Sequence, residues 1–242
     1  MEIATEIPRL AEIPEAEARD PHLLSPAEQS ELLAGHPWSR FAVLGDSIAK
    51  GMGDPTEGYL TATWGGRLAA ALARDRAGFT YANLARHRAK AADIRDEQLG
   101  PALDFAPDLV AFIGGGNDLF AEEFDIASVR ATIDAIVAAL TDAGATVVTY
   151  EALDFPRAFP DPAFEEFNRR LLELYAATRE VARERGTVHV DLYSEPWARE
   201  RYCFSADLQH PTMRAQALCA SATARALGEH LRTAERRPGT RI

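Results

Sequence analysis

Short apolar runs alternate with longer helical patterns along most of this chain, and no other feature restricts its fold as much. Five runs have the continuous apolar character of strands buried on both faces: 41–44, 79–84, 109–113, 146–150 and 188–192. Between the later runs, apolar residues recur at helical spacing over 126–140 and 164–181, and Gly144 and Gly186 follow as stop signals. Strands that alternate with helices of this length form β-α-β units. The sequence therefore predicts an α/β fold, a three-layer α/β/α sandwich around a mostly parallel five-stranded sheet.

Residues 1–37 depart from this alternation, because they are acidic and hold five prolines. Within them, Ser25 and Pro26 followed by acidic residues are typical of a helix N-terminus. We therefore predict one short helix in this N-terminal extension and a loosely ordered chain before it. We expect a single folded domain over 38–232. The end of the chain, 233–242, includes the run Arg-Arg-Pro-Gly and is predicted to be a frayed tail.

Charge and composition exclude several classes of function. The formal net charge is −11, and an acidic surface repels phosphates, so we expect neither nucleic-acid binding nor docking on anionic membranes. No apolar run approaches the ~20 residues of a membrane span, and the first residues lack the basic start of a signal peptide, so we expect a cytoplasmic protein. Cys203 and Cys219 form no CxxC pattern, which argues against a disulfide framework. No pattern indicates an oligomeric state.

A serine follows the first predicted strand, in the run Gly45-Asp46-Ser47. Ligands of parallel sheets bind outside the carboxyl ends of the strands, so a polar side chain here is a candidate site residue. At the start of a helix, the serine hydroxyl would lie where developing negative charge is stabilised. The alternative is an ordinary helix cap. The nucleophilic interpretation requires a histidine that takes the hydroxyl proton.

His210 is the strongest candidate for that base among the six histidines. It follows an acid three residues earlier, Asp207, and precedes Pro211, which begins a helical pattern. In a turn, Asp207 could accept the Nδ1–H of His210 and leave Nε2 free to face a serine, which is the logic of a catalytic triad. The alternative is a turn aspartate beside a polar surface histidine. For this spacing alone, the two interpretations are about equally supported.

The third predicted strand ends in three glycines followed by Asn117. An Asn amide there could donate to the oxyanion of a tetrahedral intermediate, because the glycines allow close approach of the backbone. The alternative is a glycine-rich turn with a satisfied Asn. The glycines match neither phosphate-binding motif, GxGxxG or GxxxxGK[ST]. No HExxH or clustered ligand pattern occurs either, so we expect no metal and no cofactor.

Taken together, these motifs resemble those of the SGNH (GDSL) hydrolases, a family of esterases, lipases and thioesterases. The resemblance spans roughly residues 38–230, and its blocks are 41–47, the GxND run 115–118 and the DxxH-Pro run 207–211. It implies the family's flavodoxin-like fold for 38–232. It also implies Ser47 as nucleophile, His210 as base, Asp207 as the acid that orients it, and Ser47 and Asn117 as oxyanion donors. Asp46 and Gly115 would be supporting motif residues.

One block departs from the family pattern. The family's second block runs Asn-Leu-Ala/Gly-x-x-Gly, and the backbone N–H of its last glycine is an oxyanion donor. Here Arg88 stands at that position. Every residue except proline has a backbone N–H, so the resemblance still implies Arg88 in the oxyanion hole. A glycine there suggests a positive φ, which costs an arginine roughly 1–2 kcal/mol. We expect the guanidinium to bind a substrate carboxylate or replace a donor. The alternatives are a shifted loop whose N–H no longer points at the oxyanion, so that Arg88 spoils the hole, and a solvated side chain.

Three functions follow from these residues. The first is a serine hydrolase that cleaves an ester or thioester of a small molecule through an acyl-enzyme at Ser47. The second is an acyltransferase that passes the same acyl group to a hydroxyl or amine. The third, less expected, is a domain that has lost catalysis and only binds. Specificity would be set by loops at 52–63 and 155–162. An apolar acyl pocket could include Phe120, Phe124, Phe155 and Phe159, although aromatics near strand ends more often belong to a core.

Overall fold

The computed structural model describes residues 5–10 and 12–235. Its five strands form one sheet in the order β2-β1-β3-β4-β5, and every neighbouring pair is parallel. The strands are β1 (Arg40–Gly45), β2 (Thr80–Asn83), β3 (Leu109–Ile113), β4 (Thr146–Glu151) and β5 (Val188–Asp191). All five predicted strands are therefore present, with ends shifted by at most one residue, and the predicted sandwich fold is confirmed.

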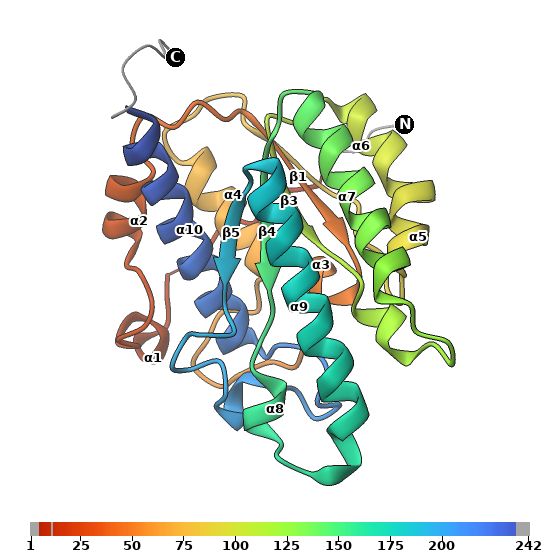
Figure 1. Ribbon diagram of the computed structural model, residues 1–242. Helices are drawn as coiled ribbons and strands as arrows, with labels where there is room; N and C mark the ends of the chain where they lie inside the picture. The colour runs from red at the N-terminus through yellow and green to blue at the C-terminus, as the bar shows by residue number, and fades with distance from the viewer. Residues whose placement is uncertain (1–4, 11, 236–242) are drawn as a thin grey trace.

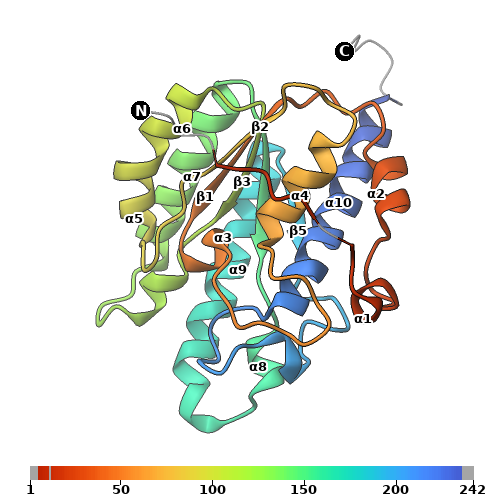
Figure 2. The ribbon, with the colours of Figure 1, turned by 180° about the vertical axis from the view of Figure 1, so that it is seen from behind.

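Helices cover both faces of the sheet. On one side, α10 packs against α4, α2 and β5; on the other, α9 packs against α7 and β4, and α6 against β1 (Figure 1 and, from behind, Figure 2). The α-helices are α1 (Glu15–Ala18), α2 (Pro26–Leu32), α3 (Ser47–Lys50), α4 (Trp64–Ala73), α5 (Ala91–Asp93), α6 (Leu99–Phe105), α7 (Ile126–Asp142), α8 (Phe155–Ala158), α9 (Glu165–Arg185) and α10 (Met213–Glu235). Shorter turns are η1 (Ile94–Gln98, a π-helix), η2 (Gly116–Phe120), η3 (Pro162–Phe164) and η4 (Arg201–Cys203).

The two helices predicted from apolar periodicity end for the expected reason. α7 is capped by the Asp125 side chain, which accepts from the N–H of Ala127, and the chain leaves it through Gly144 at φ +89°. α9 ends at Gly186 at φ +67°. Both glycines adopt the left-handed conformation, which favours residues without a Cβ atom. The helices therefore begin and end where local chemistry dictates, and their apolar faces meet the sheet.

The N-terminal extension is ordered to a greater extent than predicted. The predicted helix is present as α2, and the Ser25 side chain accepts from the N–H of Glu28 in a capping box. The chain before it was expected to be loose, but it contains α1 and is held by side chains. Glu17 of α1 forms a buried bidentate ion pair with Arg67 of α4. This ion pair, which the composition does not indicate, is the physical reason why the chain before α2 is ordered.

The other end of the chain also differs from the prediction. α10 continues to Glu235, so residues 233–235 of the predicted tail are helical, and 236–242 lie outside the described residues. α10 packs against α4, α2 and β5, contacts that favour a regular helix here. Among the helices that the structure describes, none is long and apolar enough to cross a membrane.

Candidate active site

The run Gly45-Asp46-Ser47 lies at the carboxyl end of β1, and the backbone conformation of its first residue is one that only glycine allows. Gly45 has φ +143°, and a Cβ atom there would lie 1.9 Å from the carbonyl oxygen of Ile113. The buried side chain of Gln98 bonds both backbone groups of Gly45: its Nε2 donates to the carbonyl oxygen and its Oε1 accepts from the N–H, each at 2.8 Å. The point at which the chain leaves β1 is therefore held from two sides.

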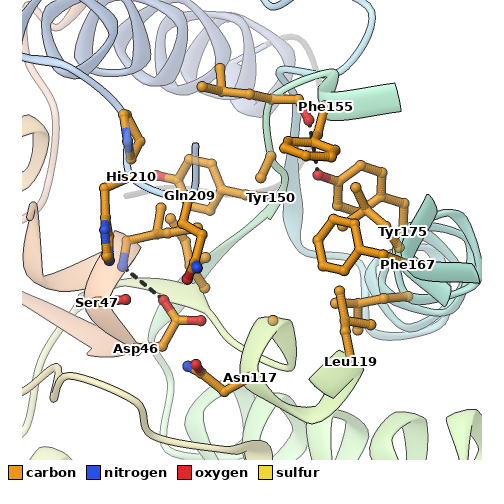
Figure 3. Close-up of a pocket in the computed structure, with 18 of the residues that line it drawn as sticks. Asp46, Ser47, Asn117, Leu119, Tyr150, Phe155, Phe167, Tyr175, Gln209 and His210 are labelled. Carbon is orange, nitrogen blue, oxygen red and sulfur yellow. Dashed lines mark hydrogen bonds between the residues drawn. The ribbon is translucent and has the colours of Figure 1, made fainter. Parts of the chain in front are cut away.

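Asp46 and Ser47 begin α3. The Asp46 carboxylate accepts from the N–H of Ile48 at 2.9 Å as the helix cap, a contact drawn in Figure 3. Burial raises the pKa of Asp46 to about 6, against the lowering effect of backbone hydrogen bonds from Ile48 and Ala49. Ser47 is the first residue of the helix and its side chain lines a cavity. Within the described residues, the Ser47 hydroxyl has no hydrogen-bond partner and is available to a ligand.

The DxxH run forms a tight turn between two paired segments, since Phe204 and Pro211 form an antiparallel bridge. Asp207 accepts from the backbone N–H groups of Gln209 and His210, and its second oxygen accepts from Nδ1–H of His210 at 2.5 Å. Burial raises the pKa of Asp207, but the hydrogen bonds from His210 and Gln209 outweigh it, so the net pKa is lowered. Asp207 is therefore ionised near neutral pH and holds the imidazole with Nε2 free of any described partner.

Asn117 lies in η2, directly after the strand-end glycines. Its Nδ2 donates to the carbonyl oxygen of Ala89 at 3.1 Å and thereby joins η2 to the loop that carries the second block. Gly115 has φ +93°, and a Cβ atom there would lie 2.7 Å from Leu174 of α9. An amide NH₂ group has two donors, so the second N–H of Asn117 remains for a ligand in the cavity that this residue lines.

Arg88 has φ +61°, the conformation that the usual glycine suggests. Its side chain is exposed, does not line the cavity and forms no ion pair within the described part of the chain. This favours the solvated alternative over the expected contact with substrate. Its backbone N–H, like that of Ser47, donates to no acceptor among the described residues. Beside it, the exposed His87 ring lies 6.3 Å from the His210 ring, a neighbour that the sequence did not indicate.

One cavity of about 470 Å³ connects these residues. Asp46, Ser47, Asn117, Asp207 and His210 all line it, whereas Gly115 and Arg88 do not. Figure 3 shows Ser47 and His210 at one end of the cavity and Phe155, Phe167 and Tyr175 at the other. The structure therefore brings together five of the seven residues that the sequence indicated, at one end of a largely apolar chamber.

Two of the four candidate pocket phenylalanines line the cavity: Phe120 and Phe155 do, whereas Phe124 and Phe159 do not. The sequence did not indicate eight further apolar lining residues as site residues. They lie at or just after the ends of β4 and β5, directly before α9 or on α9, and they are Tyr150, Leu153, Phe164, Phe167, Leu171, Leu174, Tyr175 and Leu192. The helical periodicity of the residues between 164 and 175 is visible in the sequence, but it indicates packing equally well.

No group of three or more His, Cys, Asp or Glu side chains within the described ranges could hold a metal ion.

Comparison with known protein families gives a match over residues 43–218, which is most of the chain. The matching model describes the GDSL-like lipase/acylhydrolase family. The chain belongs to this family. Membership places the protein among the esterases and lipases, and the matched segment includes Ser47, Asn117, Asp207 and His210. Comparison with curated proteins finds no match.

Solved structures share the fold of this GDSL-family protein. An acetylxylan esterase from Geobacillus stearothermophilus, in a catalytic-mutant form, aligns with a TM-score of 0.65 at 15% identity over 78% of this chain and 94% of its own. An α/β hydrolase from the metagenome of Lake Arreo, Spain, aligns with a TM-score of 0.64 at 19% identity, over 78% of this chain and 95% of its own. A lipase/acylhydrolase from Enterococcus faecalis aligns with a TM-score of 0.60 at 18% identity, over 79% of this chain and 96% of its own. At these identities, the alignments establish the fold.

Proposed function

We propose that this GDSL-family protein is a serine esterase that cleaves small-molecule esters or thioesters through an acyl-enzyme at Ser47. The observation that carries the proposal is the 2.5 Å hydrogen bond between Asp207 and His210, in the lining of the cavity that Ser47 and Asn117 also line. A structural turn needs no such pair. A general base needs its imidazole held in one tautomer with Nε2 directed toward the nucleophile.

The chemistry follows from these groups. The Ser47 hydroxyl attacks the ester carbonyl carbon while its proton passes to Nε2 of His210, and the imidazolium that forms is stabilised by ionised Asp207. The carbonyl oxygen becomes an oxyanion. When the tetrahedral intermediate collapses, the C–O or C–S bond breaks and His210 returns the proton to the leaving alcohol or thiol. A water molecule, deprotonated by His210, then attacks the acyl-enzyme and releases the acid.

Three donors would stabilise the oxyanion in this mechanism: the backbone N–H of Ser47, the free N–H of the Asn117 amide and the backbone N–H of Arg88. Removing one such donor in an acyl-transfer enzyme costs on the order of 3–4 kcal/mol in the transition state. The support for this assignment is that both backbone groups lack protein acceptors among the described residues. The N–H of Ser47 is at the start of a helix, where no intrahelical acceptor exists, and Arg88 is exposed, so both donors remain for water or a ligand.

The proposal is tested by the reaction of the purified protein with a fluorophosphonate and by its activity on p-nitrophenyl esters. We expect stoichiometric labelling that maps to Ser47, and loss of both labelling and turnover in Ser47→Ala. Ser128→Ala, which changes an exposed serine at the start of α7, is the matched control and should behave as wild type. Wild-type turnover in Ser47→Ala would refute the mechanism, and complete resistance to the probe would indicate a binding domain instead.

A further inference from the structure

The apolar end of the cavity has few free polar groups to offer a ligand. The hydroxyl of Tyr175 donates to the carbonyl oxygen of Leu153, and that of Thr178 to the carbonyl oxygen of Leu174. The Tyr150 hydroxyl pairs with Thr223. These buried hydroxyl donors are used within the protein, so a sugar or another polyhydroxylated group placed here would find no free donor among them and would lose hydrogen bonds to water.

The charged side chains of the lining are occupied as well. Arg170 donates to the carbonyl oxygens of Leu119 and Ala121, at 2.9 and 2.7 Å, and its Nε forms an ion pair with Glu166. Arg170 is the one arginine of the described lining, and its Nε and Nη1 groups are engaged within the protein. The chamber is therefore suited to an apolar group.

A row of phenylalanine rings leads from the surface into this chamber. Phe120, at the outer end, is 60% exposed and stacks on Phe167 at 5.3 Å between ring centroids. Phe167 contacts Phe155 at 5.2 Å, and Phe155 contacts Phe204 at 6.0 Å. The exposed ring surface of Phe120 contributes no hydrophobic free energy to folding. An apolar ligand that covers this surface would remove it from water, which favours binding.

The position of His210 decides which half of an ester enters the chamber. The leaving group must receive its proton from His210, so it lies on the side of the 206–209 turn, whose residues are exposed. The acyl group points away from His210, toward the apolar end that Figure 3 shows opposite it. From this geometry we infer that the chamber binds the acyl chain of the substrate, and that the substrate is the ester or thioester of a medium- or long-chain apolar acid rather than an acetyl ester. This inference rests on the proposed function.

The wild-type protein alone can test this. With p-nitrophenol as a constant leaving group, kcat/KM should rise from the acetyl through the butyryl to the octanoyl ester, by at least about tenfold overall. A fully buried methylene contributes about fourfold. In a second series, acetate esters of methyl, butyl and octyl alcohol should differ far less. A preference for acetyl over octanoyl, or a rate that follows the alcohol length instead, would overturn the inference.

Two neighbouring leucines of α9 provide a matched pair of variants. Leu171 is 7% exposed and lines the cavity, whereas Leu172 is 43% exposed and does not. Leu171→Trp places an indole in the chamber and should lower the ratio of octanoyl to acetyl kcat/KM by about tenfold or more. Leu172→Trp should leave that ratio unchanged. Because overpacking can prevent folding, Phe120→Ala at the exposed entrance gives a second test and should lower the same ratio several-fold. Unchanged ratios in folded Leu171→Trp and Phe120→Ala would contradict the inference.

Ser47→Ala separates failure of this inference from failure of the mechanism. If acetyl-ester cleavage requires Ser47 but longer acyl groups are not preferred, the chamber assignment is wrong and the acyl-enzyme stands. If Ser47→Ala keeps cleaving the whole ester series, the proposed function is wrong and this inference falls with it.

Discussion

Two aspartates near Ser47 have opposite electrostatic surroundings. Asp46 is buried under the turn and its pKa is raised to about 6, whereas hydrogen bonds lower the pKa of Asp207 against its partial burial. Only Asp207 accepts a hydrogen bond from the imidazole of His210. The spacing DxxH predicted that pairing. It could not predict the effect of burial on Asp46, which depends on residues far away in the chain.

For Asp207→Asn, we expect kcat to fall by about 10–100-fold while the fold is preserved. The amide can present a donor to Nδ1 and favour the wrong tautomer of His210, a change that costs about 10⁴ in the serine-protease example. We expect a smaller loss because Asp207 is half exposed, so water can stabilise part of the imidazolium charge. Steady-state kinetics with circular dichroism as a fold control measures this. An unchanged kcat would remove Asp207 from the mechanism.

Asp46→Asn should change the pH dependence of stability. Between the ordinary carboxyl pKa of 3.8 and the native value of about 6, the folded state binds more protons than the unfolded state, so the free energy of unfolding falls as pH rises. An asparagine side chain can still accept the capping hydrogen bond from Ile48, and it does not titrate, so its contribution to the free energy of unfolding does not fall as pH rises. Above pH ~6 the variant should gain roughly 1–3 kcal/mol over wild type, and below pH ~4 nothing.

Urea unfolding at several pH values measures this effect. Asp125→Asn changes another capping aspartate, which is exposed at the start of α7, and is the control. An Asp46→Asn variant whose stability relative to wild type does not vary with pH would show that burial does not perturb this carboxyl group.

Arg88→Gly should stabilise the protein and leave specificity unaltered. Relief of the positive φ is worth roughly 1–2 kcal/mol, and the extra freedom of glycine in the unfolded chain offsets about half of it. Because the side chain is exposed and outside the cavity, kcat/KM should change equally and by less than about threefold on matched neutral and anionic esters. A loss confined to the anionic ester would restore the contact with substrate that the sequence suggested.

At the scale of elements, α9 shows why part of the site could not be predicted. Apolar periodicity over 164–181 correctly predicted the helix and its buried face. The same periodicity serves both residues that pack on the sheet and residues that line a cavity, such as Phe167, Leu171 and Leu174. Which of the two applies depends on how far α9 stands from β4 and α8, and no local pattern encodes that distance.

The N-terminal extension holds elements that carry the site. Glu17 pairs with Arg67 of α4, and its carboxylate also accepts from the N–H of Leu60. Asp20 accepts from the Tyr59 hydroxyl and from Nε of Arg214, which is in the first turn of α10, four residues after His210. The segment that contains Glu17 and Asp20 therefore binds two parts of the domain: the loop with Tyr59 and Leu60, and the start of α10. The acidic, proline-rich composition predicted only a loosely ordered chain before α2.

Glu17→Gln should lower the free energy of unfolding by about 3–5 kcal/mol, because it leaves the buried Arg67 charge without its partner. Glu15→Gln, in the same helix, breaks an exposed pair with Arg19 and should cost about 1 kcal/mol or less. Chemical denaturation of both variants measures the difference. Equal effects would mean that the extension does not contribute to the stability of the domain.

At the scale of the whole molecule, the alternation of strands and helices determined the fold class correctly, because parallel strands buried on both faces have recognisable sequences. The positions of Ser47, Asn117 and His210 at the carboxyl edge followed from the general location of ligand sites in such sheets. The cavity did not follow, since its walls come from β4, α8, α9 and the 204–211 turn together. Local patterns predict elements, whereas a volume between elements arises from their packing.

The acyl-enzyme is most directly tested by intact-protein mass spectrometry after acid quench of the protein during turnover of p-nitrophenyl octanoate. The account predicts a mass increase of one octanoyl group, located by peptide mapping on Ser47 and absent from Ser47→Ala. Turnover without any covalent adduct in Ser47→Ala, or an adduct on another residue of the wild-type protein, would contradict it.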